Sequence, residues 1–227
     1  MTAAAHEHIG TVYGALLNDR ATVARLTPQF SEAPYKAPPQ APVLYIKPRN
    51  TLAAEGAVVP VPEQPGEVRV DATIGLVIGR AATRVTREQA LSHVSGFVIA
   101  SDLTLPHESY YRPAIRQRCR DQFCPMSAPL SNVHDFDVNK AHLEVLISNP
   151  AGDRSVAYRR SFADLVRSAA VLLCDVTEFM TLSPGDVLLL GPGEGSPIAH
   201  PGDSVSIHVP GLGRLSHSLV VQRGALA

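Results

Sequence analysis

The pattern of apolar and polar positions predicts many short strands. Apolar runs over 12–17, 43–47 and 74–78 have the length of buried strands. Apolar and polar residues alternate over 68–73 and again over 142–147, which predicts strands with one polar face. The other expected strands follow turn signals or lie near the end of the chain, at 97–103, 187–190, 204–209 and 215–221. The proline-punctuated stretch 58–65 predicts an edge strand or a loop.

Helical spacing occurs in three segments. A helix capped by Asn18 or Asp19 is expected to end before Pro28, and a capping box predicts a second helix over 86–94. A third helix is expected to open at Ser161, with apolar positions at Leu165, Val166, Ala169, Leu172, Leu173, Val176, Phe179 and Met180. Because strands dominate without regular alternation with helices, the pattern predicts a predominantly β, α+β fold with two or three outer helices.

The most polar segment is 101–125, which begins at the end of the predicted strand 97–103. It contains Asp102, His107, Glu108, Tyr110, Tyr111, Arg112, Arg116, Arg118, Arg120 and Asp121. A strand that leads into such side chains is a common way to line a pocket. Guanidinium groups pair bidentately with carboxylates, so the segment predicts a ligand that carries carboxylates. Structural salt bridges of Arg112, Arg116 and Arg120 to Asp121, Glu108 or a neighbouring subunit are an equally good explanation.

Composition narrows the function classes. The 227 residues fit one large domain, and the net charge of −1 provides no footprint for nucleic acid or an anionic membrane. No apolar run reaches the roughly 20 residues of a membrane span, and the first residues lack a secretion signal. The three cysteines form no CxxC pair, which predicts free thiols in a cytoplasmic protein and argues against structural zinc.

Several motifs resemble the fumarylacetoacetate hydrolase family. They are PYKAPP at 34–39, IKPRNTL at 46–52, TIGLVIGRAATRV at 73–85, SYYRPAI at 109–115, CRDQFCP at 119–125 and LSPGDVLLLG at 182–191. Within the family, the motifs are most similar to the N-terminal half or subunit of the bifunctional isomerase/decarboxylases of 4-hydroxyphenylacetate (homoprotocatechuate) degradation. The resemblance implies a mixed β-sandwich or β-roll, with an N-terminal strand and lid region over 1–57 and a compact core over 58–227.

The resemblance also implies Mg²⁺ or Mn²⁺ held by three carboxylates, two from a Glu-x-Glu pair and one from an aspartate. These positions fall on Asp71, Thr73 and Asp102, so one carboxylate is replaced by a neutral hydroxyl. Hard divalent cations need several oxygen ligands, and the chain is therefore expected either to bind metal weakly or to be metal-free. The alternative is that Asp71 is a surface acid and Asp102 caps a turn.

Two other implied features are altered. The lid histidine and glutamate fall on Thr22 and Arg25, and neither can act as a general base near neutral pH. A glycine turn near the pocket lacks its implied hydroxyl donor and is Gly191-Pro192-Gly193 here. Together with Thr73, the changes at Thr22 and Arg25 predict that the metal-dependent chemistry is reduced or is carried out by a partner.

The implied ligand-holding residues are retained. Lys47, Tyr111 and Arg112 fall on substrate-binding positions. The candidate catalytic residues are Asp102, His107 and Arg118, with Arg118 at a position usually held by lysine. His107 titrates in the range that suits an acid or base, although a lone histidine next to a proline is more often a surface or hydrogen-bonding residue.

The resemblance implies decarboxylation of 5-oxopent-3-ene-1,2,5-tricarboxylate and isomerisation of 2-hydroxyhepta-2,4-diene-1,7-dioate, both through a dienolate that cations stabilise. The chain is then an enzyme, or a subunit of one, that takes a small carboxylate substrate. A second hypothesis is a non-catalytic subunit that stabilises a metal-competent homologous C-terminal subunit. A third is a sensor that only binds an acid. The expected assembly is a homodimer or a hetero-oligomer with that homologue.

Overall fold

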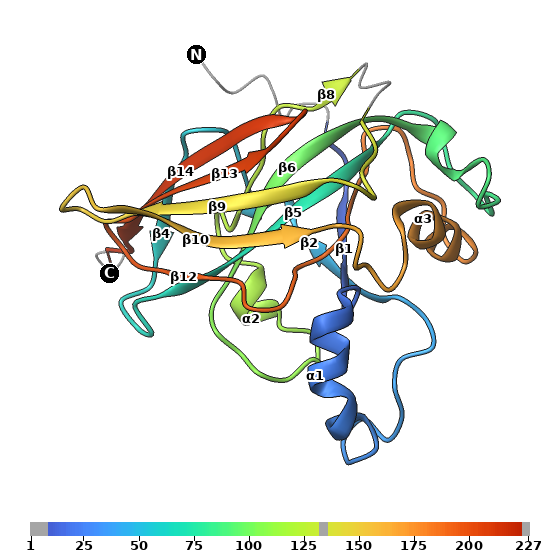
Figure 1. The fold of residues 1–227 in the computed structure, drawn as a ribbon, viewed down its shortest axis with the longest axis horizontal. Helices are drawn as coiled ribbons and strands as arrows, with labels where there is room; N and C mark the ends of the chain where they lie inside the picture. Colours follow the sequence, from blue (N-terminus) through green and yellow to red (C-terminus); the bar gives the residue numbers. More distant parts are fainter. Residues whose placement is uncertain (1–8, 132–135, 224–227) are drawn as a thin grey trace.

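Two β-sheets packed against each other form the body of the protein (Figure 1). The computed structural model describes residues 9–131 and 136–223. The larger sheet has the order β2-β1-β11-β5-β6-β8, with β12 paired to β5. Its strands are β1 (Val12–Leu16), β2 (Val43–Lys47), β5 (Val68–Ile78), β6 (Val94–Thr104), β8 (Leu130–Ser131), β11 (Val187–Leu189) and β12 (Ile198–Ala199).

The second sheet has five strands in the order β10-β9-β13-β14-β4. They are β4 (Val58–Val61), β9 (His142–Ser148), β10 (Arg154–Ser161), β13 (Ser204–Val209) and β14 (Gly213–Val221). A small parallel pair joins β3 (Leu52–Ala53) to β7 (Cys124–Pro125). The predicted predominantly β fold is confirmed, and β4 is the expected edge strand.

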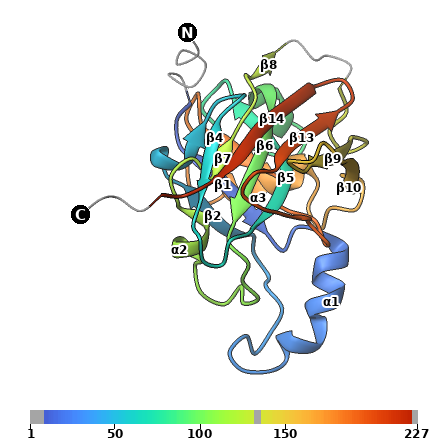
Figure 2. The same cartoon turned by 90° about the vertical axis from the view of Figure 1, so that its left-hand side faces the viewer.

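Helices lie outside the sheets. They are α1 (Arg20–Phe30), α2 (Ile115–Arg118) and α3 (Ala169–Thr177), with 3₁₀ turns at η2 (Arg49–Thr51) and η3 (Ala90–His93). Helix α1 projects from one end of the body (Figure 2). Strands β1 and β2 belong to the larger sheet, so part of the predicted N-terminal region 1–57 shares a layer with the core. No helix within 9–131 or 136–223 is long and apolar enough to cross a membrane.

Strand β5 is buried on both faces. Its even-numbered residues from Val68 to Leu76 pack into the main core, together with residues of the five-stranded sheet. On the opposite face, Val77 joins a second apolar cluster with Val98 and Ala100 of β6. Because strand side chains alternate between faces, Asp71 lies on the face of this second cluster. The predicted polar face over 68–73 is therefore buried at Asp71 and Thr73.

Three predicted helix boundaries were wrong. Helix α1 continues through Pro28 to Phe30, because Phe30 is buried in a small apolar cluster against β1. The expected helix over 86–94 is only the turn η3, since Val94 already pairs with Ile78 of β5. Helix α3 begins at Ala169 because the residues up to Ser161 form β10.

Phe179 lies beyond the end of α3 and is 67% exposed, so it is not the core position that its helical spacing predicts. All three cysteines are free thiols, as expected.

Candidate functional site

Two aspartates face each other at the centre of the larger sheet. Asp71 of β5 is paired directly with Asp102 of β6 in an antiparallel register. Their exposed fractions are 1% and 0%. Neither is the surface acid or the turn-capping acid of the alternative interpretation, because both lie inside long central strands. Two carboxylates at this depth need positive partners to remain ionised.

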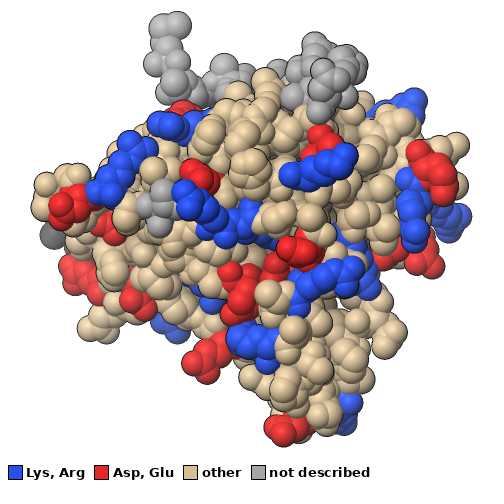
Figure 3. All heavy atoms as spheres, in the orientation of Figure 1, with Lys and Arg blue, Asp and Glu red and all other residues tan. Residues whose placement is uncertain are grey.

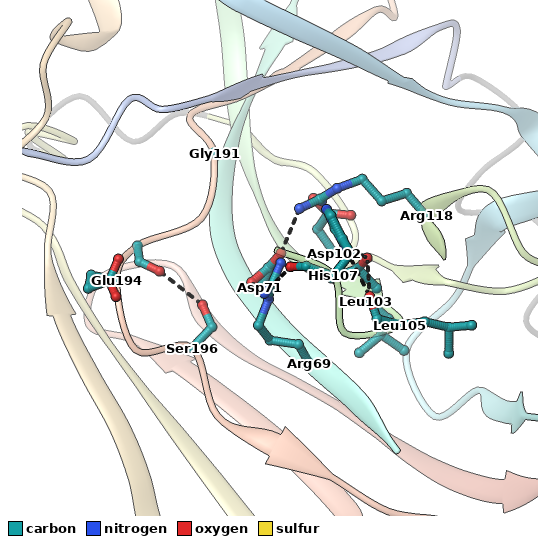
Figure 4. A network of polar contacts seen from close by, with 12 residues as sticks. Arg69, Asp71, Asp102, Leu103, Leu105, His107, Arg118, Gly191, Glu194 and Ser196 are labelled. Carbon is teal, nitrogen blue, oxygen red and sulfur yellow. Dashed lines mark hydrogen bonds and ion pairs between the residues drawn. The ribbon is translucent and has the colours of Figure 1, made fainter. Parts of the chain in front are cut away.

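Arg118 supplies one of these partners. It is the last residue of α2 and is 2% exposed. Its Nη2 lies 2.8 Å from Asp71 Oδ2, and its Nη1 lies 2.8 Å from Asp102 Oδ2. One guanidinium thus spans the two carboxylates, as seen in Figure 4. The planar fork of arginine suits this geometry.

Lys47 supplies the second partner. It is the last residue of β2, and its Nζ lies 2.8 Å from Asp102 Oδ1. The same ammonium donates to the carbonyl oxygens of Leu103 and Arg118 at 3.2 and 2.7 Å. The Lys47 side chain is completely buried, so it contacts Asp102 within the protein interior and does not face an open cleft.

Tyr45 completes the group and is itself partly buried. It lies two residues before Lys47 on β2, and its hydroxyl donates to Asp102 Oδ2. The Arg118 guanidinium lies 4.8 Å from the centre of its ring. Gly14 of β1 pairs with Tyr45, and a Cβ at Gly14 would collide with the Tyr45 ring. Glycine at this position is therefore required for the tyrosine to reach Asp102.

Electrostatics keep this group ionised. Burial alone would raise the pKa of Asp102, but Lys47 and Arg118 hold that pKa below its ordinary value. Burial would lower the pKa of Arg118, whereas Asp102 and Asp71 raise it. Burial and the Asp102 charge raise the pKa of Tyr45, so the phenol stays protonated and acts as a donor. The interior therefore holds a charged network in which each aspartate is ion-paired, although Arg118 Nε has no hydrogen-bond partner.

Arg69 connects this network to a polar cleft of about 180 Å³. Its Nε lies 3.1 Å from Asp71 Oδ1, and its side chain is 20% exposed. The cleft is lined by Leu17, Thr22, Arg25, Arg69, Asp71, Tyr110, Pro192, Gly193, Glu194, Gly195 and Ser196. Arg25 forms an ion pair of 2.7 Å with Glu194, and both residues line the cleft. The cleft is therefore lined by a guanidinium from β5, which is the less exposed of the two and marks its floor, and by a second one from helix α1.

The predicted segment around His107 borders a different, open cleft of about 650 Å³. His107, Tyr111 and Arg112 line it together with Pro34, Glu108, Ser109, Pro113, Ala114 and Gln117. The backbone oxygen of His107 accepts from Arg69 Nη1 at 3.5 Å, so the two clefts meet at this segment. Burial lowers the pKa of His107, and its Nδ1 lies 3.0 Å from the Leu105 oxygen.

The predicted site residues therefore fall into two groups. Asp102, Arg118 and Lys47 form the buried network, whereas His107, Tyr111 and Arg112 border the open cleft. Within the described residues, none of the arginines at 112, 116 and 120 forms the predicted salt bridge to Asp121 or Glu108. Arg120 instead donates to the Gln222 side chain at 2.9 Å.

The donor set does not fit a divalent metal. Each carboxylate oxygen of Asp71 and Asp102 lies within 3.1 Å of a cationic side chain. The Thr73 hydroxyl is buried and neutral, and its only described contact is a donation of 3.4 Å to the Ile74 oxygen. No group of three or more His, Cys, Asp or Glu side chains is placed to hold a metal in residues 9–131 and 136–223.

Sequence reasoning missed Arg69 and Tyr45. Arg69 lies two residues before Asp71 on β5, and Tyr45 lies two residues before Lys47 on β2. The period of two along a strand places each pair on one face, and this was the available signal. On the face seen in Figure 3, charges of both signs are interspersed, so surface charge does not mark the site.

The fold, the central aspartate pair and the adjoining cleft define a member of the fumarylacetoacetate hydrolase family. The model of the fumarylacetoacetate (FAA) hydrolase C-terminal domain matches residues 11–220, and the chain belongs to this family. It is 39% identical over 216 residues to the 4-hydroxyphenylacetate degradation bifunctional isomerase/decarboxylase of Escherichia coli. That match covers 94% of this chain and 48% of the relative, so the chain spans about half the length of the relative.

Two solved structures share the fold. A 5-carboxymethyl-2-hydroxymuconate delta-isomerase from Mycobacterium smegmatis is 24% identical with a TM-score of 0.77, covering 95% of this chain and 80% of that one. A fumarylpyruvate hydrolase from Pseudomonas aeruginosa, solved with Mn²⁺ and pyruvate, is 21% identical with a TM-score of 0.76. This second match covers 94% of this chain and 90% of the hydrolase. The predicted family and its β-rich fold are thus confirmed.

Proposed function

We propose that this chain acts as one half of an isomerase/decarboxylase of 4-hydroxyphenylacetate catabolism, on a small 2-oxo di- or tricarboxylic acid. The observation that carries the proposal is the pair of arginines lining the small cleft, Arg69 at its floor and Arg25 on its lid. The bifunctional relatives, at 38–39% identity, support the reaction class.

The proposed chemistry is stabilisation of negative charge. Loss of CO₂ or migration of a double bond in such an acid passes through a dienolate, whose oxygen needs positive charge close by. Arg69 is held in place by Asp71 and presents its partly exposed guanidinium to the cleft. The buried Asp102, Arg118 and Lys47 act as positioning residues beneath it, because they cannot reach a ligand in the cleft.

The second cleft supplies the remaining contacts of the proposal. Tyr111 and Arg112 are both exposed on its wall and are available to a distal carboxylate. His107 lies between the clefts and is the candidate proton donor or acceptor. Its lowered pKa favours the neutral imidazole near neutral pH, the form in which it accepts a proton.

The assay follows the ultraviolet absorbance of the two conjugated acids, 5-oxopent-3-ene-1,2,5-tricarboxylate and 2-hydroxyhepta-2,4-diene-1,7-dioate, with the purified chain. Arg69→Gln is expected to lower kcat/KM by roughly 10²-fold, the usual effect of removing one donor from a developing anion. The matched control is Arg159→Gln, which removes a surface ion pair between Arg159 of β10 and Glu144 of β9. Turnover of neither acid, alone or with a C-terminal homologue, would contradict the proposal.

A second candidate is a non-catalytic subunit. It is favoured by the cationic side chains that form ion pairs with the carboxylates of both aspartates, where a metal would otherwise bind. The chain would then pair with a homologous C-terminal subunit that binds metal, or assemble as a homodimer. Activity that appears only on mixing the two chains, and that Arg69→Gln leaves unchanged, would support this candidate. Sedimentation of the mixture would report the assembly.

A further inference from the structure

We propose that Arg118 is a built-in cation that takes the place of a divalent metal between Asp71 and Asp102. The inference concerns the floor of the cleft and does not depend on which acid the chain acts on. It assigns to this site a permanent positive charge that needs no metal.

The contacts account for every carboxylate oxygen. Arg118 takes Oδ2 of both aspartates at 2.8 Å. Arg69 takes Oδ1 of Asp71 at 3.1 Å, and Lys47 takes Oδ1 of Asp102 at 2.8 Å. A metal that bridged the two strands would have to displace the Arg118 guanidinium, which is 2% exposed and lies between the two carboxylates.

Charge counting leads to the same result. Arg69, Lys47 and Arg118 against Asp71 and Asp102 leave one net positive charge at the floor. A divalent ion would raise this to three, or to two if it displaced Arg118, in a site where both carboxylates are fully buried, which is strongly unfavourable. The absence of a carboxylate at position 73 fits this arrangement, because a third acid is not needed when side chains supply the positive charge.

The consequence is that the floor attracts an anion rather than a cation. The charges of Arg118 and Lys47 are balanced by the two aspartates. The remaining positive charge is that of Arg69, which lines the cleft. Arg118 is a positioning residue in this scheme, since it fixes Asp71, which in turn orients Arg69.

The test titrates Mn²⁺ into the purified chain and measures the free ion by electron paramagnetic resonance. With Mn²⁺ and protein each at about 100 micromolar, the wild-type protein is expected to leave the signal of free Mn²⁺ undiminished. The double variant Thr73→Glu/Arg118→Ala has three carboxylates and no guanidinium between them. It is expected to bind Mn²⁺ at least about tenfold more tightly than the wild type, because ligand number and charge set the affinity.

Thr73→Glu alone is the matched control, because it adds the carboxylate while keeping Arg118, and it is expected to bind Mn²⁺ more weakly than the double variant. Arg118→Ala alone is expected to lower Tm by on the order of 10 °C through loss of buried pairs. Stoichiometric Mn²⁺ binding by the wild type that Asp71→Asn abolishes would overturn the proposal, even if a variant fails to fold. Equal affinity of Thr73→Glu and the double variant would overturn it as well. No substrate enters these measurements, so their failure is distinct from failure of the proposed reaction.

Discussion

Replacing Asp102 by asparagine should destabilise the protein far more than replacing an exposed aspartate. The substitution keeps the size of the side chain but removes its charge. Lys47 then loses its ion-pair partner while its side chain remains fully buried, whereas Arg118 keeps Asp71. Breaking a buried ion pair in this way costs about 3–5 kcal/mol. For a chain of this size the expected fall in Tm is roughly 6–20 °C.

The assay is urea unfolding followed by circular dichroism, with Asp137→Asn as the matched control. Asp137 pairs with Lys140 at 3.1 Å, but their side chains are 44% and 85% exposed. The control should change stability by no more than about 0.5–1 kcal/mol. In a further variant, Lys47→Met added to Asp102→Asn should recover part of the loss, because the unpaired buried charge is removed. Equal midpoints for Asp102→Asn and Asp137→Asn would refute the argument.

This result bears on how the function should be tested. A loss of activity in an Asp102 variant would not identify a catalytic residue, because the same change disturbs the interior. Arg69 is a better probe, since its partly exposed side chain can be altered with less effect on the buried group.

Two other predictions concern stability. Burial lowers the pKa of His217 to about 4, so the neutral form is favoured in the folded state and the unfolded state takes up a proton first as pH falls from 6.5 to 4. This contribution to the free energy of unfolding should fall by about 3 kcal/mol across that window, and His217→Gln, but not His142→Gln, should flatten the pH profile of urea midpoints. Gly191 has φ +94° and a Cβ there would overlap the Ala15 oxygen, so Gly191→Ala should cost roughly 2–4 kcal/mol. Gly152→Ala, at a position with φ +90° and open space around it, should cost only about 1–2 kcal/mol. Calorimetry compares the Tm values of the two variants, and equal Tm shifts would show that the collision with Ala15 is unimportant.

The strands were more predictable than the helices. Residues 43–47, 142–147 and 204–209 follow strand patterns that the structure reproduces closely. Helix ends depended on contacts that no local pattern contains. Phe30 extends α1 past Pro28 because it is buried against β1, and β10 occupies the residues where the third helix was expected to open. Burial on both faces of β5 could not be predicted from the sequence either, because an alternating pattern does not show that other residues cover the polar face of the strand.

The sequence by itself determined the family and the missing carboxylate at Thr73, since both depend only on residue types and their order. It also placed Arg112, Arg118 and Tyr111 in one polar segment, 101–125, but not Arg69 or Tyr45. The tertiary structure alone decided that Lys47 and Arg118 lie against the aspartates rather than in a cleft. The physical reason is that the strength of an ion pair depends on distance and burial. The partners at positions 47, 71, 102 and 118 become neighbours only when β2, β5, β6 and α2 pack together.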